Sequence, residues 1–187
     1  MDGRLHRARR HRALNTFRLH SFLSTEGDRW REPADWLAAI NRFLHGALPR
    51  GQFATMLCAV IDFDERSLKV ASAAAPLPIV VGRGGGARLL DVGGLPLGID
   101  PRAACDTLQT PFGPGSMLLA FSDALIETPS PDAPCLTLPA LAALAARHVA
   151  EGPASLVGAI LTNLSAAAHG LGDDLTITAL LHTEYAP

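Results

Sequence analysis

Apolar residues recur along the chain with different periods, which separates helical from extended segments. After Pro33, a residue suited to the first turn of a helix, they follow a 3.6-residue period and predict a helix to Ala47. A less regular stripe predicts a helix over residues 13–24, and two more predict a helix pair near the C-terminus, the second beginning after Pro153. The stripes of the three clearer helices are Trp36, Leu37, Ile40, Phe43, Leu44 and Ala47; Leu141, Leu144, Ala145 and His148; and Leu156, Val157, Ile160, Leu161 and Leu164.

The segments between these helices have the composition of strands. Residues 53–63 are almost continuously apolar, which predicts a strand covered on both faces. A polar turn over residues 62–67 should lead into a second strand, and Gly82–Gly86 should form the turn of another hairpin. This order of elements predicts an α+β layered domain rather than a parallel βαβ fold. The other strands are expected at residues 68–73, 79–81, 87–90, 117–121 and 175–181, and a glycine-rich stop at residues 170–172 should end the last helix.

Composition narrows the class of protein. The 187 residues suit a single domain, and 48% hydrophobic with 18% charged residues is typical of a globular chain. A formal charge of -2 gives no reason to expect nucleic acid or a membrane surface as a partner, and no apolar stretch is long enough to span a bilayer. Three scattered cysteines without zinc-ligand spacing suit a reducing cytosol, so a cytoplasmic location is expected. The basic segment 1–12 is interpreted as a solvated terminus, with docking to an acidic partner as the less favoured alternative.

Several common catalytic motifs are absent from the sequence. The loop Gly82–Gly86 lacks the lysine and Ser/Thr of a P-loop, no cysteine has an arginine six residues on, and neither GxSxG nor HExxH occurs. The seven histidines do not cluster as metal ligands.

Acidic residues remain at two predicted strand ends. Asp123 closes one apolar strand, and Asp173 and Asp174 open another. Carboxylates at such positions commonly cap turns. Alternatively, the two strand ends lie side by side and direct their carboxylates at a hard divalent cation, since Mg²⁺ and Mn²⁺ prefer oxygen ligands and keep several waters. Spacing alone leaves both interpretations open.

Four ordered landmarks carry a family resemblance. Phe53–Met56 is similar to an F-x-T strand, Gly93–Ile99 to a G-x-P-L-G segment, Pro114–Glu127 to PGD followed by an apolar strand and T-D-G-x-x-E, and Gly172–Thr176 to D-D-I-T. In these motifs the chain resembles the bacterial phosphatases related to the sporulation stage II E protein and the stress-response regulators, a branch of the PPM (PP2C-like) superfamily. The match covers residues 13–187 as a partial phosphatase domain and leaves residues 1–12 outside it.

The resemblance implies an α-β-β-α sandwich, with two antiparallel sheets between helical layers. It also implies two Mn²⁺ or Mg²⁺ ions held by aspartates, with a metal-bound water that attacks phosphoserine or phosphothreonine, so no protein nucleophile is needed. Asp123 corresponds to the metal aspartate of T-D-G, and Asp173 to that of D-D-I-T, with Asp174 beside it. The partner implied is a phosphorylated protein such as an anti-sigma-factor antagonist.

The sequence also departs from the family pattern. Neither the opening G-D-x-x-D strand nor the D-x-x-G-x-G turn is present, which predicts an N-terminally incomplete domain that lacks its first strands and half of its metal site. Strands left without partners predict a homo-oligomer or a missing upstream segment. The N-A-G-H stretch of the family is Ser72–Ala75 here, and Ala124 replaces the T-D-G glycine. A positive φ at Ala124 would cost on the order of 1 kcal/mol.

Three functions follow from these observations. The first is a metal-dependent serine/threonine phosphatase domain, of which this chain alone should be weak or inactive toward a generic phosphomonoester. The second is a catalytically inactive pseudophosphatase that acts as a protein-binding module. The third is an unrelated α+β domain whose aspartates only cap turns.

Overall fold

A computed structural model describes residues 19–25, 31–127, 136–165 and 174–184 of the chain. It divides into two compact units that interleave along the sequence. The first unit comprises residues 1–60, 69–74 and 93–107, and the second comprises residues 61–68, 75–92 and 108–187. The basic segment 1–12, and residues 13–18 of the predicted first helix, lie outside the described residues; residues 19–25 are helical.

The first unit is organised around helix α2 (Pro33–Ala47). The helix confirms the predicted stripe, since Trp36, Leu37, Ile40 and Leu44 are buried, each no more than 2% exposed. These side chains pack against apolar residues of strand β2 (Ser67–Ala73) and against Leu97. Burial of such a side chain contributes about 1.5–3 kcal/mol, so this one helix face accounts for much of the unit's stability.

Strand β1 (Met56–Asp62) corrects one prediction. The apolar run was expected to be covered on both faces, but β1 is only half-buried, whereas the more polar β2 is almost fully buried. The reason is position: the three-stranded sheet has the order β1-β2-β5, so β1 lies at an edge and β2 in the centre. Strand β5 (Leu108–Pro111) was not predicted, because it is short and half of its residues are polar. Its proline suits an edge strand.

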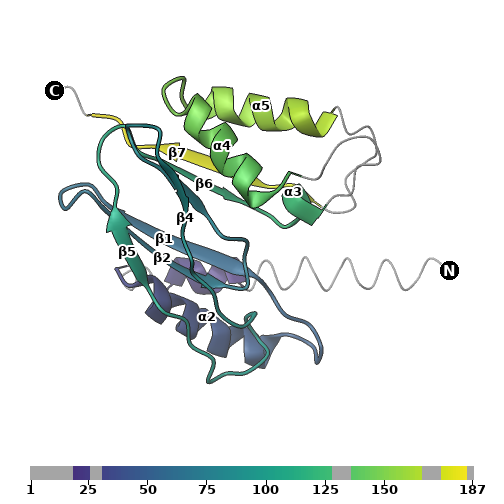
Figure 1. The fold of residues 1–187 in the computed structure, drawn as a ribbon. Coiled ribbons are helices and arrows are strands. Elements are labelled where there is room, and N and C mark those ends of the chain that lie inside the picture. Colours follow the sequence, from purple (N-terminus) through teal and green to yellow (C-terminus); the bar gives the residue numbers. More distant parts are fainter. Residues whose placement is uncertain (1–18, 26–30, 128–135, 166–173, 185–187) are drawn as a thin grey trace. The chain divides into compact units, whose positions relative to one another are not determined.

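The second unit contains an antiparallel sheet of order β4-β3-β6-β7. Its strands, all predicted, are β3 (Ile79–Val81), β4 (Ala87–Leu89), β6 (Met117–Phe121) and β7 (Ile177–Leu181). Helices α4 (Leu138–His148) and α5 (Pro153–Ser165) lie along one face of this sheet (Figure 1). A short helix that the pattern did not predict, α3 (Ala124–Glu127), follows β6.

The class expected from the sequence is confirmed: the chain is an α+β protein with two antiparallel sheets and helices. Both predicted hairpin turns are present, with Asp62 Oδ1 accepting from the Glu65 amide in one, and the Gly82 amide donating to the Gly86 carbonyl in the other. The glycine-containing segment 170–172, which was predicted to end the last helix, lies outside the described residues.

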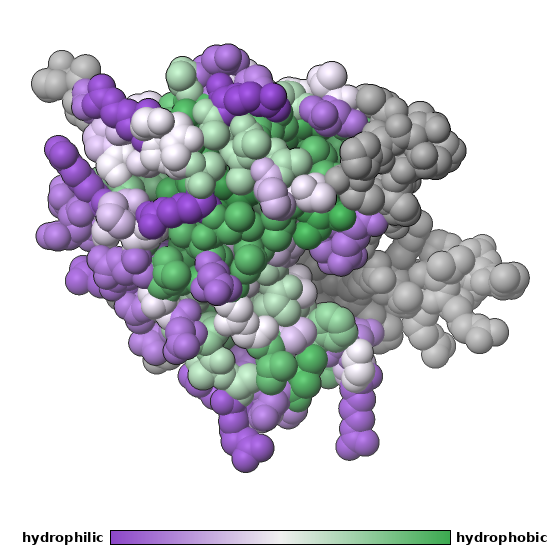
Figure 2. Space-filling model, viewed as in Figure 1, coloured by the Kyte–Doolittle hydropathy of each residue, from purple (hydrophilic) through white to green (hydrophobic). Residues whose placement is uncertain are grey.

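The surface carries apolar as well as hydrophilic side chains. Figure 2 shows apolar surface lying among hydrophilic residues on the face that it presents. None of the described helices combines the length and hydrophobicity needed to cross a bilayer. The large apolar side chains that are most exposed are Phe53, Phe63, Leu95, Ile99, Leu161 and Leu180.

Candidate functional site

The two acidic strand ends predicted from the sequence lie side by side. Phe121, the last residue of β6, is paired with Ile177, the first residue of β7. Beyond this pair, the Ser122 amide donates to the Thr176 carbonyl (3.0 Å), and the Thr176 amide donates to Ser122 Oγ (3.0 Å). Ser122 Oγ also donates to the Asp174 carbonyl (3.2 Å). Ser122 therefore ties the segment that carries Asp123 to the segment that carries Asp174.

Asp123 also begins helix α3. Its Oδ1 accepts from the Ala124 amide (2.9 Å), and its carbonyl accepts from the amides of Ile126 and Glu127. Ala124 is not among the residues with positive φ, so the strain expected from the lost glycine does not arise here. Asp123 thus takes part in the turn that begins α3, and because the residue is exposed its side chain is compatible with a role in binding.

The donors at these strand ends have the right chemistry for one hard divalent cation. Exposed carboxylates from Asp123 and Asp174 would suffice for Mg²⁺ or Mn²⁺, which complete their shells with water. Asp173, the corresponding family ligand, lies outside the described residues. Within the described part of the chain, no group of three or more His, Cys, Asp or Glu side chains is placed to hold a metal ion.

The stretch Ser72–Ala75, which replaces N-A-G-H of the family, contains a residue with an unusual backbone conformation. Ala74 stands where the N-A-G-H stretch has its glycine, and it keeps a left-handed backbone (φ 56°). This conformation costs a residue with a Cβ about 1–2 kcal/mol, which glycine does not pay. Ala74 therefore carries strain that the family's glycine avoids.

Replacing Ala74 with glycine is expected to raise the free energy of unfolding by about 0.5–1 kcal/mol, because relief of strain exceeds the extra entropy of an unfolded glycine. Urea unfolding followed by circular dichroism measures the change. Ala104→Gly is the control: Ala104 is exposed with an ordinary φ, so this variant should lose about 0.4–1 kcal/mol. Destabilisation by both substitutions would contradict the prediction.

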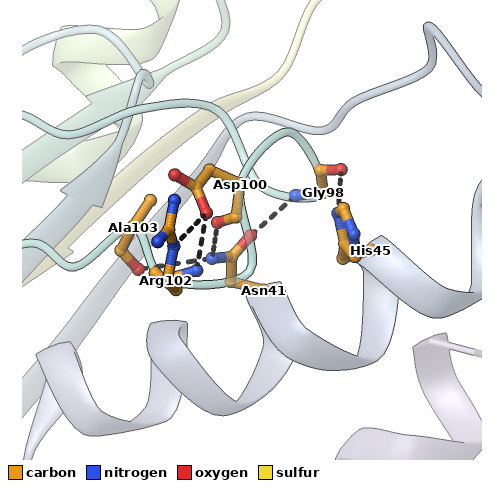
Figure 3. Close-up of polar contacts among 6 residues, drawn as sticks. All are labelled: Asn41, His45, Gly98, Asp100, Arg102 and Ala103. Atoms are coloured by element: carbon orange, nitrogen blue, oxygen red, sulfur yellow. Dashed lines mark hydrogen bonds and ion pairs between the residues drawn. The ribbon is translucent and has the colours of Figure 1, made fainter.

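A polar cluster in the first unit holds the loop that follows the G-x-P-L-G segment (Figure 3). Asn41, buried on α2, donates through Nδ2 to the carbonyls of Asp100 (2.8 Å) and Ala103 (3.3 Å). Its Oδ1 accepts from the Gly98 amide (2.8 Å), and His45 Nδ1 lies 3.1 Å from the Gly98 carbonyl. Sequence reasoning missed this cluster, although an asparagine four residues after Leu37, on the apolar stripe, was a usable signal.

Two other groups of reactive side chains have structural explanations. Burial, with a smaller contribution from Cys105, raises the pKa of the Cys58 thiol to about 11, so it is not a nucleophilic thiolate at neutral pH. His148 Nδ1 lies near both Ser155 Oγ (2.9 Å) and Glu151 Oε2 (3.0 Å). A serine–histidine–acid relay needs both ring nitrogens, so this cluster only joins the end of α4 to the start of α5.

Solved structures show to which class this arrangement belongs. The RsbU and RsbW domains of Rv1364c from Mycobacterium tuberculosis are 25% identical, with a TM-score of 0.68 over 91% of this chain and 46% of that one. The SiaA-PP2C domain of Pseudomonas aeruginosa is 16% identical, with a TM-score of 0.73 over 88% of this chain and 65% of that one. The phosphatase domain of the cell fate determinant SpoIIE from Bacillus subtilis, presoaked with Mn, is 17% identical, with a TM-score of 0.57 over 81% of this chain and 66% of that one. The fold is that of PP2C-type phosphatase domains.

The family follows from the sequence match. The family model described as Stage II sporulation protein E (SpoIIE) matches residues 11–182, so the chain belongs to the SpoIIE family. This confirms the resemblance drawn from the four motifs. The chain spans about half to two thirds of the structures that it resembles. Among curated proteins, no significant match was found.

Proposed function

We propose that residues 13–187 form the part of a metal-dependent protein serine/threonine phosphatase domain that supplies Asp123 and Asp173–Asp174 to a Mn²⁺ or Mg²⁺ site. The observation that carries this proposal is the hydrogen bonding of Ser122, which joins the two acidic strand ends. Membership of the SpoIIE family supports the same activity. The proposed substrate is a phosphoserine or phosphothreonine of a cytoplasmic protein, such as an anti-sigma-factor antagonist.

The chain's own residues would position the site. Ser122 fixes the spacing of the strand ends, and the Ala124 amide orients the carboxylate of Asp123. Asp123, with Asp173 or Asp174, would then offer oxygen ligands. A divalent cation bound there lowers the pKa of a coordinated water and neutralises charge on phosphoryl oxygens.

A second candidate is a pseudophosphatase that binds a phosphoprotein without turnover. It is favoured by two departures from the family pattern inside the matched region: Ser72–Ala75 stand where the family has N-A-G-H, and Ala124 replaces the T-D-G glycine.

Both candidates include a metal site at Asp123. Titration of the full chain with Mn²⁺, followed by electron paramagnetic resonance, tests whether that site binds the ion. Asp123→Asn should weaken Mn²⁺ binding about ten-fold, because asparagine still caps α3 but lacks the charge of the ligand. The control Asp35→Asn removes an exposed acidic residue from the first turn of α2 and should leave Mn²⁺ binding unchanged.

Hydrolysis of a phosphoserine peptide in Mn²⁺ tests for the enzyme directly. We expect this chain to turn over little or none of it, and turnover abolished by Asp123→Asn would favour the enzyme. Mn²⁺ binding that depends on Asp123, without turnover, is the result expected of this chain under either candidate. Equal Mn²⁺ binding by wild type, Asp123→Asn and Asp35→Asn would refute the metal site itself.

A further inference from the structure

A pocket of about 520 Å³ lies at the C-terminal end of α2, entirely within the first unit. One part of its wall is the segment 48–53, which leaves the helix and turns at Gly51 (φ 83°). His45, from the last turn of α2, and Gly98 with Ile99 complete it. This volume is within the range of roughly 300–1,000 Å³ that is usual for binding pockets.

The walls of this pocket are held by hydrogen bonds, so its shape exists before any ligand binds. The Leu48 amide donates to the Leu44 carbonyl (2.8 Å), which fixes where the chain leaves α2. Ala54 and Leu97 exchange two backbone hydrogen bonds, of 3.0 and 2.8 Å, just beyond the lining residues. Asn41 and His45 hold Gly98, as Figure 3 shows. A pre-organised pocket loses less ordering entropy on binding.

The lining combines exposed apolar side chains with basic groups. Phe53 is 58% exposed and Ile99 is 51% exposed, although both are large and apolar. The ionisable side chains of the lining are His45 and Arg50, and no carboxylate lines the pocket. Within the described part of the chain, no ion pair of Arg50 is formed.

The nearest acidic neighbour along the chain, Asp100, interacts with His45 and with Arg102, and no ion pair joins it to Arg50 among the described residues. Asp100 follows Ile99, but its Oδ1 accepts from the Arg102 amide (2.9 Å) and lies 3.5 Å from Arg102 Nε. The hydrogen bond from that amide lowers the pKa of the Asp100 carboxyl, so the group stays ionised and engaged with Arg102 at neutral pH. Among the described residues, the Arg50 guanidinium thus has no acidic partner, and it lines the pocket together with the aromatic side chain of Phe53. Arginine and aromatic residues are both enriched in protein-binding interfaces.

We propose that this pocket binds an acidic peptide segment of a partner protein. An apolar side chain of the peptide packs against Phe53 and Ile99, and a neighbouring carboxylate pairs with Arg50. A small molecule suits the pocket less well, since such ligands are usually buried by roughly 70–90%, whereas Phe53 and Ile99 are each more than half exposed. The proposal does not depend on the metal site proposed above.

The test uses the full chain and two fluorescein-labelled hexapeptides, one with a leucine flanked by glutamates and one with the glutamates replaced by glutamines. Fluorescence anisotropy at about 50 mM salt, where screening is weak, gives both affinities. The glutamate peptide should bind about five-fold more tightly than the glutamine peptide, as expected for one exposed ion pair of favourable geometry.

Three variants locate the binding. Arg50→Gln should remove the preference for the glutamate peptide, and Phe53→Ser should weaken both peptides by about five-fold. Arg31→Gln removes an exposed arginine of the same unit outside the pocket and should change neither affinity. Thermal unfolding followed by circular dichroism checks that each variant is folded. If Phe53→Ser is unfolded, Ile99→Ser takes its place.

Each other outcome overturns the proposal. Equal affinity for the two peptides would show that Arg50 does not recognise the glutamates. The same conclusion would follow if Arg31→Gln lost the preference for the glutamate peptide as much as Arg50→Gln does. Absence of peptide binding, together with self-association in sedimentation that Arg50→Gln and Phe53→Ser disperse, would assign the pocket to a second copy of this chain. Asp123→Asn should bind both peptides like wild type, so failure of the metal proposal is distinguishable from failure here.

Discussion

Replacing Asn41 with alanine is expected to lower the free energy of unfolding by about 3 kcal/mol, because three hydrogen bonds of about 1 kcal/mol each are lost at a buried site. The Asn41 side chain is 2% exposed and bonds the Gly98 amide and the carbonyls of Asp100 and Ala103. The alanine side chain cannot hydrogen-bond to any of these three loop groups, and the cavity left behind lowers the free energy of unfolding further. Urea unfolding followed by circular dichroism measures the loss.

Two further variants test whether the hydrogen bonds are the cause. Asn41→Asp keeps an acceptor for the Gly98 amide but faces two carbonyls without donors, so it should cost at least as much as alanine. Asn163→Ala is the control, since Asn163 is exposed and its Nδ2 donates to the Ala159 carbonyl (2.7 Å) of its own helix. A loss below about 1 kcal/mol for Asn41→Ala would show that the loop is held by something else.

Replacing Gly94 with alanine is expected to lower the free energy of unfolding by about 2–3 kcal/mol, as overpacking against backbone does. A Cβ on Gly94 would lie 2.7 Å from the Ser72 carbonyl oxygen and 3.1 Å from the Cys105 Cβ. Ser72 is fully buried in the central strand β2, so its carbonyl cannot move without disturbing the sheet. The loop would have to shift instead.

The neighbouring glycine provides a matched control. A Cβ on Gly93 would meet nothing within 4 Å, and its φ is not positive. Gly93→Ala should therefore be neutral, or stabilising by about 0.4–1 kcal/mol through the entropy of the unfolded chain. Equal effects of the two substitutions in the same urea titration would show that close approach to Ser72 is not the reason for glycine at position 94.

The sequence and the structure contribute differently to the candidate sites. The landmarks around Asp123 and Asp174 could be read from the sequence, because each consists of consecutive residues. Their adjacency could not, since it depends on the pairing of β6 with β7 and on the bonds of Ser122. The pocket beside Arg50 had no sequence signal at all, because its walls come from segments about 45 residues apart.

Local periodicity by itself determined most of the elements of this protein. The stripe after Pro33 predicted α2, and the apolar runs predicted β3, β6 and β7, because side-chain period follows directly from backbone geometry. Only the tertiary structure decided burial within the three-stranded sheet, where the apolar β1 lies at an edge and the more polar β2 in the centre. It also decided the left-handed backbone of Ala74 and the partners of Asn41. These features depend on which distant segment lies alongside, and no local pattern of residues encodes that.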